Sequence, residues 1–402
     1  MLKITKYIYI VFVLLVSINF WSFQGDKYVS ELKNIQLIIS ISFIFIIVIF
    51  RKQANNMYFK KYILLFMLLP FLSIITSYFV HDQSIGISAM VMRMQLAWLF
   101  YFVLHRLKIS ENEILKIIIG IGFIWVILEL IQQFTYPVYY FFTRGDDTYW
   151  WGIEKRAGFY RYMIDGISFA LLALFYYLQK FFNTNQKRAK NSFWIISLLL
   201  GIYLFMTRQI MASVLASILI GQLLLKRIPL NRRISIFIIG ILMVGSIFYF
   251  KDTIFGDLVE TTSDDMNKDN IRIESYYFHL NYWDHWTCFV FGNGVPHEQS
   301  SYGKYTNYLQ KEVGLHRSDI GIIGELSNYG IIYIIVFILF CFYFFRKSKE
   351  IELYLKIYFI YSLLIIPMIF PFRNFPEFLV FSVFLYLCDL SIANHSKKSI
   401  SL

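Results

Sequence analysis

The chain has 402 residues, of which 58% are hydrophobic and 20% aromatic, and its formal net charge is +12. Because a soluble domain averages about 45–50% apolar residues, this composition excludes an ordinary soluble enzyme or binding module. The basic residues lie at the ends of apolar runs, so the positive charge indicates membrane topology and not a nucleic-acid partner.

Apolar runs of about 17–25 residues recur along the whole chain, which predicts an all-α bundle of about twelve transmembrane helices. The first run follows a basic start, and no small-residue cleavage site comes after it, so we interpret it as an uncleaved span. The predicted spans are 7–23, 35–50, 62–80, 85–104, 114–134, 163–182, 193–206, 209–225, 233–250, 319–345, 354–370 and 374–391.

The distribution of lysine and arginine predicts the orientation of these spans. Basic connections alternate with connections that are poor in Lys and Arg or rich in acids, and the positive-inside rule places the basic set in the cytoplasm. The basic connections are 51–61, 105–113, 186–190, 226–233, 346–350 and the pair 397–398. Within a single membrane domain, 1–402, we therefore expect both termini in the cytoplasm and two long external loops, 135–162 and 251–318. Any chemistry is expected on the external side, where most carboxylates lie.

Five arginines are expected near the external boundary of the membrane. Two precede a helix, one lies at the tip of a tight helical hairpin, and two belong to the second long loop: Arg156, Arg161, Arg208, Arg272 and Arg317. Guanidinium groups bind phosphate oxygens in pairs, so their convergence would suit a lipid-linked diphosphate. Alternatively, each arginine extends from a helix end and pairs with lipid phosphates or with a nearby acid.

His316, Asp319 and Glu325 are candidates for proton transfer. His316 and Asp319 are three residues apart, so they share a face if a helix has begun there, and an imidazole can take a proton from a sugar hydroxyl. Capping of the helix by Ser318 or Asp319 is the alternative. Glu325 lies deeper in the apolar run, where a carboxylate is either functional or paired with an intramembrane arginine.

No metal or cofactor is expected. His279, His285 and Cys288 do not have the spacing of a zinc site, and their apolar neighbours favour packing. Gly292, Asn293 and Gly294 form a Gly-x-Gly that does not lie between a strand and a helix, so we interpret it as a turn and not as a phosphate loop.

Five segments, taken in order, resemble the bacterial O-antigen polymerase and O-antigen ligase superfamily. They are "KRAGFYRYMIDGISFALLAL", "MTRQIMASVLASILIG", "RIESYYFHLNYW", "VFGNG" and "HRSDIGIIGELSNYGIIY". The similarity in order and topology extends over roughly 85–390. The chain departs from the family at His316, which is followed by Arg317 where the family often has Asn, and in its shorter Arg156–Gly158 segment.

The resemblance implies a metal-independent glycosyltransferase of the bacterial inner membrane, with its active site facing the periplasm or the cell exterior. Such a polymerase transfers a glycan from undecaprenyl diphosphate to a sugar hydroxyl of another lipid-linked repeat unit. Arg208 and Arg272 would bind the diphosphate, and His316 would be the base or a diphosphate contact, oriented by Asp319 or Glu325. Membrane lipids and a chain-length regulator are the further partners that it implies.

Three alternatives remain open from the sequence. An O-antigen ligase differs from the polymerase in its acceptor, which one sequence does not reveal. A flippase for lipid-linked oligosaccharides would also have about twelve spans, but it does not need a polar loop as long as 251–318. A transferase that uses a polyprenyl monophosphate sugar would usually have adjacent acids in its first external loop, where this chain has only the separated Asp26 and Glu31.

The charge pattern makes a testable prediction about topology. A reporter fused after Lys268 should be active only outside the membrane, and one fused after Lys190 only inside, because basic connections stay in the cytoplasm. Paired phosphatase and fluorescent-protein fusions measure this directly. Activity of both fusions on the same side would refute the predicted orientation.

Overall fold

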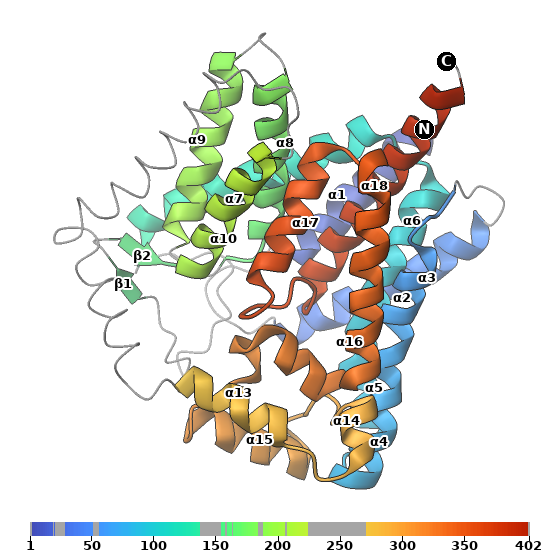
Figure 1. Cartoon of the computed structure of the whole chain (residues 1–402), viewed down its shortest axis with the longest axis vertical. Helices are drawn as coiled ribbons and strands as arrows, with labels where there is room; N and C mark the ends of the chain where they lie inside the picture. The colour runs from blue at the N-terminus through green and yellow to red at the C-terminus, as the bar shows by residue number, and fades with distance from the viewer. Residues whose placement is uncertain are drawn as a thin grey trace. The chain divides into compact units, whose positions relative to one another are not determined.

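A computed structural model shows a predominantly helical chain (Figure 1). It describes residues 2–18, 20, 29–50, 56–136, 154–156, 159–162, 164–183, 188–205, 207–223 and 271–400. Three stretches lie outside these ranges: the predicted span 233–250, residues 251–270 of the second long loop, and residues 137–153 of the first. The chain divides into two compact units, which we describe separately: Met1–Ile39, Ile109–Asp264 and Glu352–Leu364 form unit 1, and Ser40–Lys108, Asp265–Ile351 and Ile365–Leu402 form unit 2.

The structure supports a membrane protein. Five helical segments of the described residues are long and apolar enough to cross a bilayer: Lys60–His81, Ile85–Leu107, Glu111–Thr135, Gly321–Glu350 and Phe375–Lys397. Four apolar helices are shorter: Ile4–Ser17, Asn34–Ile49, Arg208–Leu223 and Leu353–Ile365. A twelve-span bundle is therefore not confirmed in this part of the chain.

Unit 1 is built around three helices that pack on one another: α7 (Glu111–Thr135), α8 (Ile167–Asn183) and α9 (Arg188–Leu204). Ser110 begins α7 with a capping box, in which its hydroxyl accepts from the Glu113 amide and the Glu113 carboxylate accepts from the Ser110 amide. A Cβ at Gly122 would lie 3.1 Å from the Ala170 backbone, so this glycine allows α7 and α8 to approach closely.

The remaining elements of unit 1 are α1 (Leu2–Ser17), the start of α2 (Val29–Ile49), the strands β1 (Glu154–Arg156) and β2 (Phe159–Arg161), α10 (Arg208–Leu223) and most of α17 (Leu353–Ile365). The two strands pair antiparallel, with Glu154 opposite Arg161 and Arg156 opposite Phe159. Gln179 of α8 holds the start of α17, because its amide accepts from the Tyr354 N–H and donates to Glu352 Oε2.

Unit 2 contains four of the five long apolar segments. Its elements are the end of α2, α3 (Lys60–Leu68), η1 (Leu69–Leu72), α4 (Ser73–His81), α5 (Ile85–Met92), η2 (Arg93–Trp98), α6 (Leu99–Leu107), α13 (Ile271–Asn281), α14 (Trp286–Phe291), α15 (Ser301–Lys311), η3 (Arg317–Asp319), α16 (Gly321–Lys347), η4 (Ser348–Glu350) and α18 (Phe375–Ile400). Phe66, Trp98, Phe340 and Phe372 are nearly completely buried in its core, where the Phe66 and Trp98 rings are stacked and the other ring pairs are edge to face or tilted.

A buried carboxylate joins three helices of unit 2 at one end. Asp389 of α18 accepts hydrogen bonds from the Tyr101 hydroxyl, from His105 Nε2 at 2.9 Å and from the Tyr58 amide at 3.1 Å. Tyr101 and His105 lie on α6, and Tyr58 precedes α3. Because a buried carboxylate without donors is costly, this arrangement fixes α18 against α6 and the start of α3.

Helix α16 is broken at Gly330, where φ is 78° and ψ is 177°. The break leaves the carbonyl groups of Ser327 and Asn328 free to accept hydrogen bonds from another segment. The amide of Asn293 donates to Ser327 O at 2.8 Å, and the amide of Gly294 donates to Asn328 O at 2.9 Å. The segment that follows α14 is therefore bound to α16 through the backbone.

The start of α16 is also satisfied by backbone groups. Prolines 367 and 371 follow α17, which ends at Ile365 and not at 370 as expected, because proline cannot continue a helix without losing a backbone hydrogen bond. The non-helical segment after α17 offers its carbonyls to α16: Gly321 N donates to Met368 O, and Ile322 N donates to Ile366 O, both at 3.1 Å. Neither Ser318 nor Asp319 caps α16, whose N-cap is Ile320 without a side-chain hydrogen bond.

Gly330→Ala should destabilise the purified protein by at least about 1–2 kcal/mol, the cost of a non-glycine residue at positive φ. A Cβ there would also collide with Val290 O and the Gly292 amide. The matched control is Gly86→Ala, since nothing lies within 4 Å of a Cβ at that position and Gly86 lies in α5. Unfolding in detergent at increasing denaturant measures both variants. Equal stability of the two would show that the break in α16 does not require glycine.

Candidate functional site

Much of the predicted second long loop is helical in the described part. We call residues 271–319 the cap: it comprises α13, α14, α15 and η3, which gather at the end of unit 2 where α4 ends (Figure 1). Local signals begin two of its helices, because His285 Nδ1 accepts from the Thr287 amide and Ser300 Oγ accepts from the Gly303 amide. The cap is thus an ordered structure that places side chains against the end of α4.

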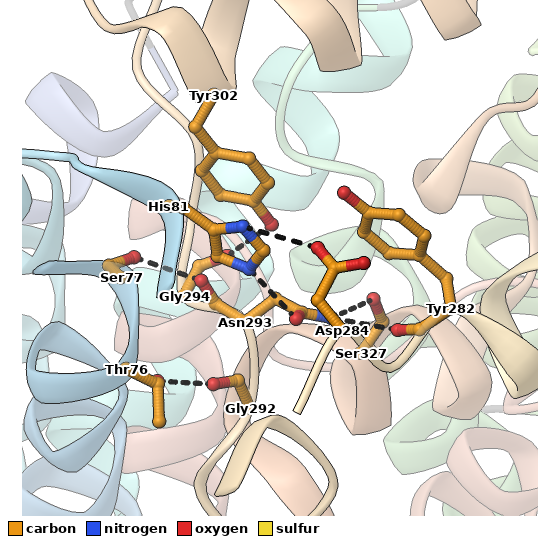
Figure 2. Close-up of polar contacts among 10 residues, drawn as sticks. All are labelled: Thr76, Ser77, His81, Tyr282, Asp284, Gly292, Asn293, Gly294, Tyr302 and Ser327. Carbon is orange, nitrogen blue, oxygen red and sulfur yellow. Dashed lines mark hydrogen bonds and ion pairs between the residues drawn. The ribbon is translucent and has the colours of Figure 1, made fainter. Parts of the chain in front are cut away.

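Residues Gly292–Gly294 are held from two sides. The amides of Asn293 and Gly294 bind α16, as described above. The carbonyls of Gly292 and Asn293 bind α4: Thr76 Oγ1 donates to Gly292 O, and Ser77 Oγ donates to Asn293 O at 2.9 Å. Figure 2 shows these contacts together with the side chains around Asn293. The predicted turn is therefore a fixed support for the Asn293 side chain.

Gln83 supports the next stretch of the cap. Its amide nitrogen donates to Ser88 Oγ and to Val295 O, and its amide oxygen accepts from the His297 amide and from Ser300 Oγ. Gln83 is completely buried, and all of these distances lie between 2.8 and 3.0 Å. One side chain therefore connects the turn after α4 to the start of α15.

His81, the last residue of α4, lies in the centre of this arrangement. Its Nε2 is 3.0 Å from Asn293 Oδ1, and its Nδ1 is 3.7 Å from Asp284 Oδ2 (Figure 2). Its ring is stacked on Tyr302 with a centroid distance of 4.2 Å and an interplanar angle of 6°. Sequence reasoning missed His81; the signal was the short polar stretch His81–Ser84 between two apolar runs.

Arg317 is buried beside the same aromatic ring. Its guanidinium carbon lies 5.4 Å from the centre of the Tyr302 ring, and its Nη1 donates to Asn328 Oδ1 at 3.2 Å. The side chain is only 5% exposed, and Nε and Nη2 have no hydrogen-bond partner in the described residues. A buried guanidinium with two unused donors can bind an anion.

His279 of α13 is a second buried cation-forming group near Arg317. Neither of its ring nitrogens makes a hydrogen bond of normal geometry within the described chain, although the Leu315 backbone acts on its charge. Burial, and then the positive charge of Arg317, lowers the pKa of His279 to about 3. His279 is therefore neutral at physiological pH, so that Arg317 carries the positive charge of this site.

The other predicted residues have different surroundings. His316 begins η3 and is partly exposed, as is Asp319. Glu325 is buried and forms an ion pair with Arg373 of the segment between α17 and α18, with 3.9 Å between Arg373 Nε and Glu325 Oε1. Arg272 lies on α13 of the cap, partly exposed.

Unit 1 contains the other three predicted arginines. Arg208 begins α10, and Arg156 and Arg161 lie in β1 and β2. In unit 2, the structure brings Arg317 together with His279, His81 and Tyr302, none of which the sequence had identified as part of an anion site.

An apolar cavity of about 380 Å³ is lined by Val80 and His285, the chain neighbours of His81 and Asp284. It lies between α4 and α14, and Thr76, which holds Gly292, belongs to its wall. The lining residues are Ile75, Thr76, Phe79, Val80, His285, Thr287 and Phe291. Most of this lining is apolar, with polar side chains at one end, so the cavity suits part of an apolar chain.

No protein-family model matches the chain, and no curated protein is significantly similar to it in sequence. Function must therefore be argued from the site itself.

The low pKa of His279 predicts a stability loss on acidification. Between pH 6.5 and about 3, the unfolded chain binds a proton at His279 that the folded chain does not. The free energy of unfolding is therefore at its full value above pH 6.5 and decreases as the pH is lowered through this range. At pH 5 we expect the cap to be destabilised by roughly 2 kcal/mol, or about 30-fold in the protection of α13 amides against hydrogen exchange.

His279→Phe should remove most of this pH dependence, while the same change at the exposed His395 of α18 should leave it intact. The pH dependence is measured by hydrogen–deuterium exchange of the α13 amides in detergent at pH 7 and pH 5, corrected for intrinsic exchange rates. An identical pH response in wild type and His279→Phe would contradict the assignment.

Proposed function

We propose that the protein is a polysaccharide repeat-unit polymerase that transfers a glycan from undecaprenyl diphosphate to a sugar hydroxyl of another lipid-linked repeat unit. The observation that carries this proposal is Arg317, a buried guanidinium just before α16, two of whose donors have no partner among the residues that the structure describes. An isolated buried charge is expensive, so a site of this kind favours an anionic ligand that supplies the missing acceptors.

A diphosphate suits the donors around Arg317. The guanidinium offers Nε and Nη2 as a fork, which fits two phosphate oxygens. Asn328 occupies the remaining nitrogen and fixes the orientation of the fork. The positive charge would stabilise the negative charge that develops as the diphosphate leaves.

The cavity between α4 and α14 suits the carrier lipid. Its wall includes Ile75, Phe79 and Phe291, and it shares Thr76 with the clamp that fixes Asn293. An isoprenoid chain placed there would bring its diphosphate towards the polar cap. An apolar cavity beside an anion site is the combination that a polyprenyl diphosphate requires.

We further propose the topology and the roles that the sequence suggests. The chain has about twelve spans in a bacterial inner membrane, both termini are cytoplasmic, and the cap faces the periplasm or the cell exterior. The sequence resemblance also suggests a role in diphosphate binding for Arg208 and Arg272, with Arg156 and Arg161. His316 is the base or a diphosphate contact, oriented by Asp319; Glu325, bound to Arg373, has the weaker case for that role. No metal takes part, and a chain-length regulator is a candidate partner.

The test compares Arg317→Gln with Arg346→Gln, an exposed arginine at the other end of α16. Because a hydrogen bond to a charged group contributes about 1.5–3 kcal/mol, Arg317→Gln should weaken the binding of undecaprenyl diphosphate about 10- to 100-fold. Native mass spectrometry of the purified protein measures this binding. Arg346→Gln should bind as the wild type does, and unchanged binding by Arg317→Gln would refute the site.

Activity is measured in proteoliposomes with the lipid-diphosphate oligosaccharides extracted from source cells that lack this gene. Wild type should produce a ladder of longer chains, and Arg317→Gln, Arg208→Ala and Arg272→Ala should lose it. Lys at these positions should restore it only in part, because Lys lacks the planar fork. If the wild type moves the lipid-linked units across the membrane without lengthening them, the protein is a flippase; if it transfers them only to lipid A core, it is a ligase.

A further inference from the structure

The hydrogen bonds around Asn293 determine which nitrogen of His81 carries a proton. Asn293 Nδ2 donates to Tyr282 O at 3.4 Å and to Ser327 Oγ at 3.5 Å, which directs Oδ1 towards His81 (Figure 2). Oδ1 is an acceptor only, so the His81 Nε2 that faces it at 3.0 Å must be the N–H. In the neutral ring, the lone pair is therefore on Nδ1.

The surroundings hold this ring in place. Tyr302 is stacked against the His81 ring, and the His81 side chain is only 5% exposed. Rotation of the imidazole would therefore disrupt both the stack and the hydrogen bond to Asn293. The Asn293 backbone is itself fixed by Ser77 and by Ser327. The lone pair of Nδ1 is thus directed permanently towards one place.

That place is next to Asp284, whose side chain is 52% exposed. At 3.7 Å, Nδ1 and the carboxylate do not form a hydrogen bond, but a proton taken up by Nδ1 would create an ion pair between them. The charged groups that act on the ring are Asp284 and Asp82, which favour the imidazolium, and Arg317, which opposes it. The arrangement resembles a base with an orienting acceptor on one nitrogen and a stabilising carboxylate near the other.

We propose that His81, through Nδ1, is the base that deprotonates the acceptor sugar hydroxyl; this rests on the function proposed above. The hydroxyl oxygen forms the new bond to the anomeric carbon as its proton passes to Nδ1. The bond from the anomeric carbon to the diphosphate oxygen breaks, and its electron pair leaves with undecaprenyl diphosphate. Asp284 stabilises the imidazolium, which then releases the proton to water. His316 is thereby left as a diphosphate contact.

The first experiment needs no substrate. Solid-state NMR of the full-length protein in lipid, with ¹⁵N-labelled histidine, reports the protonation of each ring nitrogen, and the signals lost in His81→Gln identify His81 among the seven histidines. At pH 8 we expect a protonated Nε2 and an unprotonated Nδ1. The opposite tautomer would overturn the proposal, because Nδ1 could then not accept a proton.

The second experiment measures the rate of chain lengthening against pH with the extracted lipid-linked units. Gln can still donate to Asn293 Oδ1, so His81→Gln should fold and bind undecaprenyl diphosphate as the wild type does. Its rate of chain lengthening should nevertheless fall about 10²–10⁴-fold. The acidic limb of the pH–rate profile, the decrease in rate at low pH that protonation of the base causes, should also disappear. The matched control, His297→Gln in the same cap, should retain both rate and limb.

Asp284→Asn separates this role from a structural one. Without the carboxylate the imidazolium is less stable, so the acidic limb should move to lower pH by about half a unit to one unit, with a slower plateau. A wild type that does not lengthen chains refutes the proposed function, and with it the role of His81. A wild type that lengthens chains while His81→Gln keeps its rate and acidic limb overturns the His81 proposal alone.

Discussion

The break in α16 at Gly330 is the constraint on which the candidate site depends. It exposes the carbonyls of Ser327 and Asn328, and the amides of Asn293 and Gly294 satisfy them. Irregular backbone within an apolar segment is stable only when other protein groups complete its hydrogen bonds. Two residues of these backbone hydrogen bonds also carry polar side chains of the site. Asn293, a donor, contacts His81, and Asn328, an acceptor, contacts Arg317. The backbone hydrogen bonds that stabilise the break in α16 therefore also place the side chains of the candidate site.

The longest apolar runs could be predicted from the sequence because burial in lipid requires a continuous apolar stretch. The predictions 114–134 and 319–345 correspond to Glu111–Thr135 and Gly321–Lys347 within a few residues. Local breaks were harder to anticipate. Pro70 lies in the 3₁₀ turn Leu69–Leu72 that interrupts 62–80, and a contact with Gly292 determines the break at Gly330, which lies 38 positions further along the chain. Composition likewise described 251–318 as a polar loop, although the helices in its described part are held by specific partners such as Gln83.

The candidate site shows the same division. Arg317 could be selected because an arginine at a membrane boundary is conspicuous. His81 could not, because its importance comes from an asparagine 212 residues away and from a ring on α15. Glu325 was selected because it lies deep in an apolar run, yet the arginine that it pairs with, Arg373, lies in the non-helical segment between α17 and α18. The sequence thus identifies charged groups, whereas the contacts that give His81 its role lie more than 200 residues away along the chain.

Asp389 has a consequence for the order of synthesis. Its donors Tyr101 and His105 are made 288 and 284 residues before it, and the Tyr58 amide 331 residues before. During translation, these groups reach the membrane long before their acceptor exists. Until α18 emerges, they require temporary partners such as water, and unit 2 completes this part of its packing only after α18 has been synthesised. A prematurely terminated chain would therefore expose its unsatisfied donors to the cell's quality control.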